Sequence, residues 1–193
     1  MRRLLIVLVC VIAAGAGVVA VLQHEQPAWW VRVWYPLRYQ EVVVGNARLY
    51  HLDPALVAAV IYEESHFNAS ARSDAGAIGL MQLLPDTAHG IALHTGGGNF
   101  HPDRDLLVPD LNVRYGCWYL QHLEQKYAGY QNSMELALAA YNAGQANVDR
   151  WISQTPAGGV VEIPFPETRD YVADVERVEK LYRRAYHSEL YGS

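Results

Sequence analysis

The sequence predicts a mainly α-helical protein: a single compact helical domain preceded by one N-terminal transmembrane helix. Three observations predict this fold class. Apolar residues recur at helical spacing in several segments, and no segment shows the alternation of strands and helices that builds a parallel sheet. The nineteen residues from Leu4 to Leu22 carry no charge. The remainder, roughly residues 36–193, is long enough for one domain with a hydrophobic core.

The uncharged segment 4–22 is long enough to cross the roughly 30 Å hydrocarbon core of a bilayer as one helix. Arg2 and Arg3 precede it and favour a cytoplasmic N-terminus, so the rest of the chain would lie on the extracytoplasmic face. A cleaved signal peptide with its cleavage site at 14–16 is the alternative. Because apolar residues continue past that site to Leu22, we favour an uncleaved anchor over residues 1–27 and a folded domain over 28–193.

A group of aromatic residues directly follows the apolar segment: Trp29, Trp30, Trp34 and Tyr35. Tryptophan and tyrosine are enriched where a membrane meets water, so these residues are candidates for an interfacial belt. They are equally good candidates for packing beneath the folded domain. The sequence alone favours neither interpretation.

The first helix of the domain is predicted to begin at Asp53 and Pro54 and to run to Glu64. Aspartate caps the free amides of a first turn, and proline suits the first helical position. The apolar residues that follow have helical spacing: Leu56, Val57, Val60 and Ile61. A polar, glycine-rich stretch over residues 68–79 ends this pattern, and Pro85-Asp86 then begins a short helix.

Further helices are predicted towards the C-terminus, after a loop over residues 94–109 that contains three successive glycines. One runs from Asn112 to Tyr127, and a second begins with Ser133 as its cap and ends at Gly144. A short helix over 146–152 precedes a brief β-like stretch at 160–163. The last helix begins near Thr168, with one apolar face formed by Tyr171, Val175, Val178 and Tyr182.

Composition argues against several classes of function. The net charge of −5 disfavours a nucleic-acid partner. Cys10 and Cys117 are the only cysteines, so the domain has no internal disulfide and no metal site of the cysteine type. The eight histidines show no ligand spacing. We therefore expect no metal site formed by cysteine or histidine.

Two adjacent glutamates end the apolar helix, in the stretch I-Y-E-E-S-H-F over residues 61–67. Both Glu63 and Glu64 have apolar neighbours at helical spacing, so periodicity does not separate them. Adjacent helical residues point about 100° apart, so only one can lie at the centre of a cleft. Burial raises the pKa of a carboxyl group, which can then donate a proton near neutral pH. The alternative is a pair of solvated glutamates in a last helical turn.

Five short motifs follow one another in a fixed order. These are E-S-x-F-N from Glu64, A-x-S ending at Ser73, G-A-x-G-L-M-Q ending at Gln82, A-Y-N-A-G over 140–144 and E-T-R-x-Y over 167–171. Together they resemble the catalytic domain of the soluble lytic transglycosylase family, whose members cleave bacterial peptidoglycan. The similarity covers roughly residues 36–185. It implies the lysozyme-like α+β superfamily, a mainly helical domain with a substrate cleft.

The resemblance implies a role for each matching residue. The catalytic acid of the family directly precedes the serine, which selects Glu64. Glu63 stands where the family often has a neutral polar residue, and its charge would raise the pKa of Glu64. Tyr171 matches a tyrosine whose hydroxyl lies near the acid. The substrate-binding residues carried over from the family are Ser73, Met81, Gln82, Tyr141 and Tyr171, and Asn142 is expected to fix a helix end.

The resemblance also implies a mechanism without metal or cofactor. Glu64 would protonate the oxygen between N-acetylmuramic acid and N-acetylglucosamine, the acetamido group would stabilise C1, and the C6 hydroxyl would close a 1,6-anhydro ring. The expected partners are peptidoglycan glycan strands and, through the N-terminal helix, the bacterial plasma membrane. One rival is a goose-type lysozyme, or muramidase, that uses water. A second is a cell-wall-binding scaffold without activity.

Overall fold

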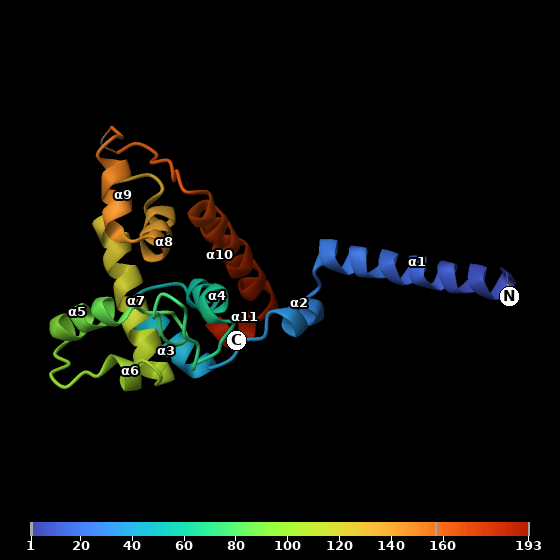
Figure 1. Cartoon of the computed structure of the whole chain (residues 1–193), viewed down its shortest axis with the longest axis horizontal. Helices are drawn as coiled ribbons and strands as arrows, with labels where there is room; N and C mark the ends of the chain where they lie inside the picture. The colour runs from blue at the N-terminus through green and yellow to red at the C-terminus, as the bar shows by residue number, and fades with distance from the viewer. Residues whose placement is uncertain (1, 157, 193) are drawn as a thin grey trace.

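The computed structural model describes residues 2–156 and 158–192, with the side chains of residue 6 and of residues 9–156 and 158–192. Every regular element in this part of the chain is a helix, which confirms the predicted mainly helical fold (Figure 1). The helices are α1 (Arg2–Glu25), α2 (Ala28–Trp34), α3 (Gln40–Leu49), α4 (Pro54–Ser65), α5 (Pro85–Thr95), α6 (Pro102–Asp105), α7 (Pro109–Lys126), α8 (Ser133–Ala143), α9 (Gln145–Ile152), α10 (Pro166–Ala185) and α11 (His187–Tyr191).

Helix α4 is the centre of the core. Its residues 55–61 are all buried, and it packs mainly against α10 and also against α3. The predicted start is confirmed, because the Asp53 side chain accepts a hydrogen bond of 2.7 Å from the Ala55 amide. The helix ends where His66 takes a left-handed backbone conformation with φ +49°. A helix enclosed along its length carries the glutamates of its last turn into the interior of the domain.

Several element bounds differ from the sequence-based expectations. Helix α7 begins at Pro109 instead of Asn112, since proline suits the first turn, and the expected loop 94–109 contains the short helix α6. The residue at the N-cap of α8 is Asn132 instead of Ser133, and its side chain bonds the backbone of Val161 and the side chain of Glu135 instead of a free amide of the helix. No strand forms at 160–163 among the described residues, and α3 and α11 had no predicted counterpart.

The turn over residues 78–83, which carries the G-L-M-Q motif, is held from three sides. The Ser65 hydroxyl of α4 donates to the Leu80 carbonyl at 2.7 Å, and the Tyr141 hydroxyl of α8 donates to the Met81 carbonyl at 2.7 Å. From α7, the Asn112 amide accepts from the Met81 N–H at 2.8 Å. The turn is therefore a rigid junction of three helices that lie far apart in the sequence.

Close packing at this junction requires glycine at two positions. Gly79 has φ +84°, and a Cβ there would lie 2.2 Å from the amide nitrogen of Asn112. A Cβ on Gly116 of α7 would lie 2.3 Å from the Met81 sulfur. Asn112 and Gly116 thus both act in packing at this junction, and Asn112 lies inside α7 instead of at its start.

Helices α1 and α2 precede the domain, and α1 projects away from it (Figure 1). Among the residues whose side chains are described, no single helix is long and apolar enough to count as a bilayer span. The segments 9–25 and 28–34 meet that criterion only together, with a bend of 95° between them. The expected span 4–22 includes residues whose side chains lie outside the described set, as do Arg2 and Arg3. The transmembrane helix therefore stays a prediction.

Candidate active site

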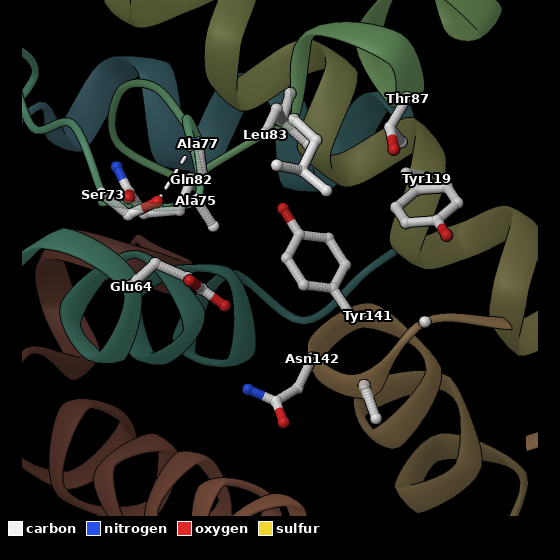
Figure 2. A pocket seen from close by; sticks show the side chains of 13 residues that line it. Glu64, Ser73, Ala75, Ala77, Gln82, Leu83, Thr87, Tyr119, Tyr141 and Asn142 are labelled. Atoms are coloured by element: carbon white, nitrogen blue, oxygen red, sulfur yellow. Dashed lines mark hydrogen bonds between the residues drawn. The ribbon is translucent and has the colours of Figure 1, made fainter. Parts of the chain in front are cut away.

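A cleft of about 490 Å³ opens beside the last turn of α4. Figure 2 shows Glu64 pointing from α4 towards Tyr141 and Asn142 of α8, with Ser73 and Gln82 on the loop above it. Glu64 is the only carboxyl group among the described residues that line the cleft. The other lining residues are Ala75, Ala77, Leu83, Leu84, Thr87, Tyr119, Ala143 and Gly144.

The carboxyl group of Glu64 is held in a state that favours its protonated form. Burial raises the pKa of Glu64 to about 7. A hydrogen bond from the Tyr171 hydroxyl, 2.7 Å from Oε1, opposes this rise, while the charge of Glu63 adds to the pKa. Burial dominates, so Glu64 exchanges a proton with its surroundings near neutral pH.

The two adjacent glutamates lie in different environments. Glu63 is half-buried, is absent from the cleft lining and faces α10, where Asp174 and Arg177 influence it. Burial, followed by the charge of Asp174, raises the pKa of Glu63. The expectation of a solvated edge residue is therefore wrong for Glu63, because α10 covers that side of α4. The different directions of adjacent helical residues separate Glu63 from the cleft.

Ser73 and Gln82 each use one hydrogen-bonding group within the protein and leave another available to the cleft. The Ser73 hydroxyl oxygen accepts from the Ala77 amide at 3.0 Å, which leaves its O–H free to donate. The Gln82 side-chain nitrogen donates to the carbonyls of Gly79 (2.9 Å) and Ala71 (3.3 Å), which leaves its oxygen as an acceptor. Gln82 also has φ +45°, a conformation that a residue other than glycine rarely adopts. Such strain concentrates at functional sites.

Asn142 offers a hydrogen-bond donor to the cleft, whereas Gln82 offers an acceptor. Its Oδ1 accepts a hydrogen bond of 3.0 Å from the hydroxyl of Thr168, which is buried at the start of α10. The side-chain NH₂ is therefore the part of Asn142 that is free for the cleft (Figure 2). The sequence interpretation assigned Asn142 to the helix end and missed this role. The signal was present in the A-Y-N-A-G motif, where the asparagine directly follows a tyrosine expected in the cleft.

Met81, Tyr141 and Tyr171 were all expected to bind substrate, and the structure gives each of them a different relation to the cleft. Met81 is fully buried, with 0% of its surface exposed, because it packs against Gly116; its expected contact with substrate is therefore corrected. Tyr141 lines the cleft, but its hydroxyl is bonded to the Met81 carbonyl, so its ring is the surface on offer. Tyr171 reaches the site through its hydrogen bond to Glu64.

Tyr119 and Thr87 also line the cleft, and the sequence interpretation did not single them out. Tyr119 lies against Tyr141 with a ring separation of 5.5 Å, so the two rings form an aromatic wall. Within the described residues, no group of three His, Cys, Asp or Glu side chains is arranged to hold a metal ion. The arrangement provides one proton-exchanging group, three directed polar groups and an aromatic wall.

Comparisons with known proteins agree with this arrangement. The sequence profile described as Transglycosylase SLT domain matches residues 41–161. Soluble lytic murein transglycosylase of Escherichia coli K12 is 32% identical over 155 residues, which cover 77% of this chain and 23% of the relative. Membrane-bound lytic murein transglycosylase C of Actinobacillus succinogenes is 33% identical over 76% of this chain and 47% of the relative. The chain thus spans about a quarter and about half of the lengths of these relatives.

Solved structures give the same result. An inactive mutant of the lytic transglycosylase Slt from Pseudomonas aeruginosa matches with a TM-score of 0.71 and 31% identity, covering 86% of this chain and 27% of that one. A 70-kDa soluble lytic transglycosylase in complex with bulgecin A matches with a TM-score of 0.69 and 27% identity, covering 80% of this chain and 25% of that one. The profile matches more than half of the chain, and the chain belongs to the transglycosylase SLT domain family.

Proposed function

We propose that this protein is a membrane-anchored peptidoglycan lytic transglycosylase, which cleaves the β-1,4 bond between N-acetylmuramic acid and N-acetylglucosamine and leaves a 1,6-anhydro ring. The observation that carries the proposal is the single carboxyl group of the cleft, Glu64, with its pKa raised to about 7. Most glycosidases need two carboxyl groups at the scissile bond, and chemistry assisted by the substrate is a recognised exception. A cleft with one carboxyl group fits that exception.

In the first step, Glu64 acts as the acid. Its proton passes to the glycosidic oxygen, the bond from that oxygen to C1 of the muramic sugar breaks, and the bond's electron pair stays with the leaving sugar. The acetamido oxygen of the muramic sugar stabilises the positive charge that develops at C1. A pKa near 7 gives Glu64 a substantial protonated fraction at neutral pH, which an ordinary glutamate lacks.

In the second step, Glu64 acts as the base. The carboxylate takes the proton of the C6 hydroxyl, and the C6 oxygen closes on C1 to form the anhydro ring, with no water consumed. This nucleophile is already attached to the reacting sugar, so the step gains from proximity. The Tyr171 hydroxyl, 2.7 Å from Oε1, stabilises the carboxylate between the two steps.

The directed polar groups suit an acetamido group. Gln82 offers an oxygen that accepts a hydrogen bond from an N–H group, and Asn142 offers an NH₂ that donates to a carbonyl. An acetamido group carries both functions. The rings of Tyr119 and Tyr141 offer flat apolar surface for sugar rings.

Residues 1–27 form the proposed anchor in the bacterial plasma membrane, and residues 28–193 form the proposed catalytic domain on its extracytoplasmic face. The name of the Actinobacillus relative, a membrane-bound enzyme, supports membrane association. The apolar α1 and its bend towards α2 support the same assignment. An anchor at this face would hold the cleft close to the cell wall.

Product analysis tests the reaction and distinguishes both rivals. Purified peptidoglycan is digested with the full chain, and the ends are identified by mass spectrometry. Anhydromuramic ends are expected, with at least about a thousandfold less product from Glu64→Gln, since that variant has no proton to donate. Reducing muramic ends would show that the protein acts as a lysozyme and not as a transglycosylase. Binding without cleavage by the parent chain would favour the scaffold.

A further inference from the structure

Helix α2 has two faces of opposite character. Towards the domain, Val31 is only 1% exposed. Away from it, Trp29 (56% exposed), Val33 (65%) and Trp34 (57%) form an apolar surface, which we call the α2 face. Large apolar residues that gather on one surface of a soluble domain indicate a partner.

The direction of α2 indicates which partner covers this face. Apolar side chains cover α1 and are exposed in the structure, including Val9, Val11, Ile12, Val18 and Val21. The polar stretch over 23–26 ends this apolar surface just before α2 begins. Residues 9–25 of α1 and residues 28–34 of α2 meet at an angle of 95°. If α1 crosses a bilayer near its normal, α2 lies parallel to the membrane surface at the depth of the headgroups. Tryptophan is enriched at that depth.

We propose that α2 lies flat on the outer surface of the membrane, with Trp29, Val33 and Trp34 inserted among the headgroups, and that it holds the domain in a fixed orientation to the lipid. This inference rests on the proposed anchor. Only the short polar stretch 23–26 separates the α2 face from the apolar surface of α1, and this proximity to the proposed span favours lipid over a second copy of the chain as the occupant.

Contacts with the domain make α2 a rigid support. From α2, Arg32 donates to the Ala185 carbonyl at 3.0 Å, pairs with Glu189 at 2.6 Å and covers the ring of Tyr186 at 4.5 Å. The Trp34 carbonyl accepts a hydrogen bond of 3.2 Å from Tyr62, in the last turns of α4. A helix fixed through Arg32 and Trp34 to α4, α10 and α11 transmits its own orientation to the cleft.

Quenching of tryptophan fluorescence by lipid tests the α2 face. The full chain is reconstituted in vesicles of phosphatidylethanolamine and phosphatidylglycerol whose acyl chains are brominated either near the headgroup or near the bilayer centre. We expect quenching, stronger for bromine near the headgroup. Replacing Trp29 and Trp34 by phenylalanine should remove most of the quenched signal, because these are the strongly exposed two of the five tryptophans in the chain.

The control is Trp118→Phe, which removes a half-buried tryptophan of α7 and should leave the quenched component unchanged. A carbonate wash of the same vesicles tests the proposed transmembrane anchor independently of the proposal for α2. A chain that resists the wash and shows no quenching overturns the α2 inference and leaves the anchor standing. A chain that the wash removes overturns the anchor, and quenching before the wash then still supports α2 as a surface helix. Cross-linked dimers without quenching would assign the face to a second copy.

The rigid support has its own test. A dye on Gln154→Cys, at an exposed site beyond α9, reports its distance to acceptor lipids by energy transfer. All proteins in this test also carry Cys10→Ala, because Cys10 is exposed and would take up the dye, whereas Cys117 is buried. We expect one narrow distance distribution for the full chain and a broad one for Arg32→Gln. Arg104→Gln, which removes an exposed ion pair on α6, should keep the narrow distribution. Equal widths for all three proteins would overturn the fixed orientation.

Discussion

Two groups of polar side chains flank the 78–83 turn, and they differ in how their hydrogen bonds are used. On the α7 side, Asn112 is fully buried, and both ends of its amide are bonded within the protein. Its oxygen accepts from the Met81 N–H, and its nitrogen donates to the carbonyls of Ile78 and Leu106, both at 2.9 Å. On the cleft side, the side-chain oxygen of Gln82 and the side-chain NH₂ of Asn142 stay available for a hydrogen bond to a ligand. The same amide chemistry therefore serves structure in one place and is available to a ligand in the other.

This difference has an energetic consequence. A buried amide with all its partners stabilises the fold, and its loss leaves several backbone groups unsatisfied. A polar group held for a ligand stabilises the fold less, and a carboxyl group forced towards its neutral form destabilises it. Substitutions on the two sides of the turn should therefore change stability in opposite directions.

The largest effect is expected on the α7 side. Asn112→Ala leaves the Met81 N–H and the Leu106 carbonyl without partners and removes one of the two hydrogen bonds to the Ile78 carbonyl, and should lower the free energy of unfolding by about 3–5 kcal/mol. Urea unfolding measures this change. The matched control is Asn147→Ala on α9, which removes a bond to the Ala143 carbonyl and a long, exposed bond of 3.4 Å from Arg150, and should cost less than about 1 kcal/mol. Equal losses in the two variants would contradict the structural role of Asn112.

A gain in stability is expected on the cleft side. The pKa of Glu64 is raised from 4.5 to about 7, so the folded state loses stability as pH rises from the unfolded pKa through the folded one. The full cost, present above pH 7, is roughly 3 kcal/mol by linkage. Glu64→Gln removes it, and should be more stable than the parent at pH 8 and gain little at pH 4.

Thermal unfolding at both pH values measures the gain, and Glu124→Gln on α7, outside the cleft, is the control with no such gain expected. A Glu64→Gln protein that is less stable than the parent at pH 8 would contradict the claim that burial governs this carboxyl group. The same result would remove the main support for its role as an acid.

A smaller effect is expected at the partner of Asn142. Thr168→Val removes the hydroxyl that fixes the Asn142 amide and keeps the volume, so the amide can turn its oxygen towards the cleft. The expected loss is about fivefold in kcat/KM, which corresponds to the usual value of one hydrogen bond near 1 kcal/mol, and it should appear mainly in KM. Thr168→Ser keeps the hydroxyl and should restore the parent value. Failure of serine to do so would assign Thr168 to packing alone.

The sequence predicted those parts of the molecule that depend on local chemistry. The Asp53–Pro54 start of α4 and the apolar face of α10 follow from capping and periodicity, and both are present. The direction of Glu64 into a cleft agrees with the family resemblance. The A-Y-N-A-G motif signals that Asn142 lies near the cleft, but which of its groups is free depends on the distant Thr168. The full burial of Met81 depends in the same way on its contact with the distant Gly116. Helix α3 has a weaker apolar pattern and depends on its packing against α4 and α7.

The smallest effect is expected at Glu63, which acts on the reaction only through its charge. That charge raises the pKa of Glu64, so Glu63→Gln should lower it. An acid works in its protonated form, which decreases as pH rises through the pKa; the alkaline limb of the kcat/KM profile should therefore move to lower pH, with a severalfold loss at pH 7 and little change at pH 5. Tyr171→Phe provides the opposite comparison, because losing a bond that stabilises the carboxylate should move the same limb to higher pH. Profiles that shift in one direction in both variants would contradict the balance of burial, charge and hydrogen bonding described for Glu64.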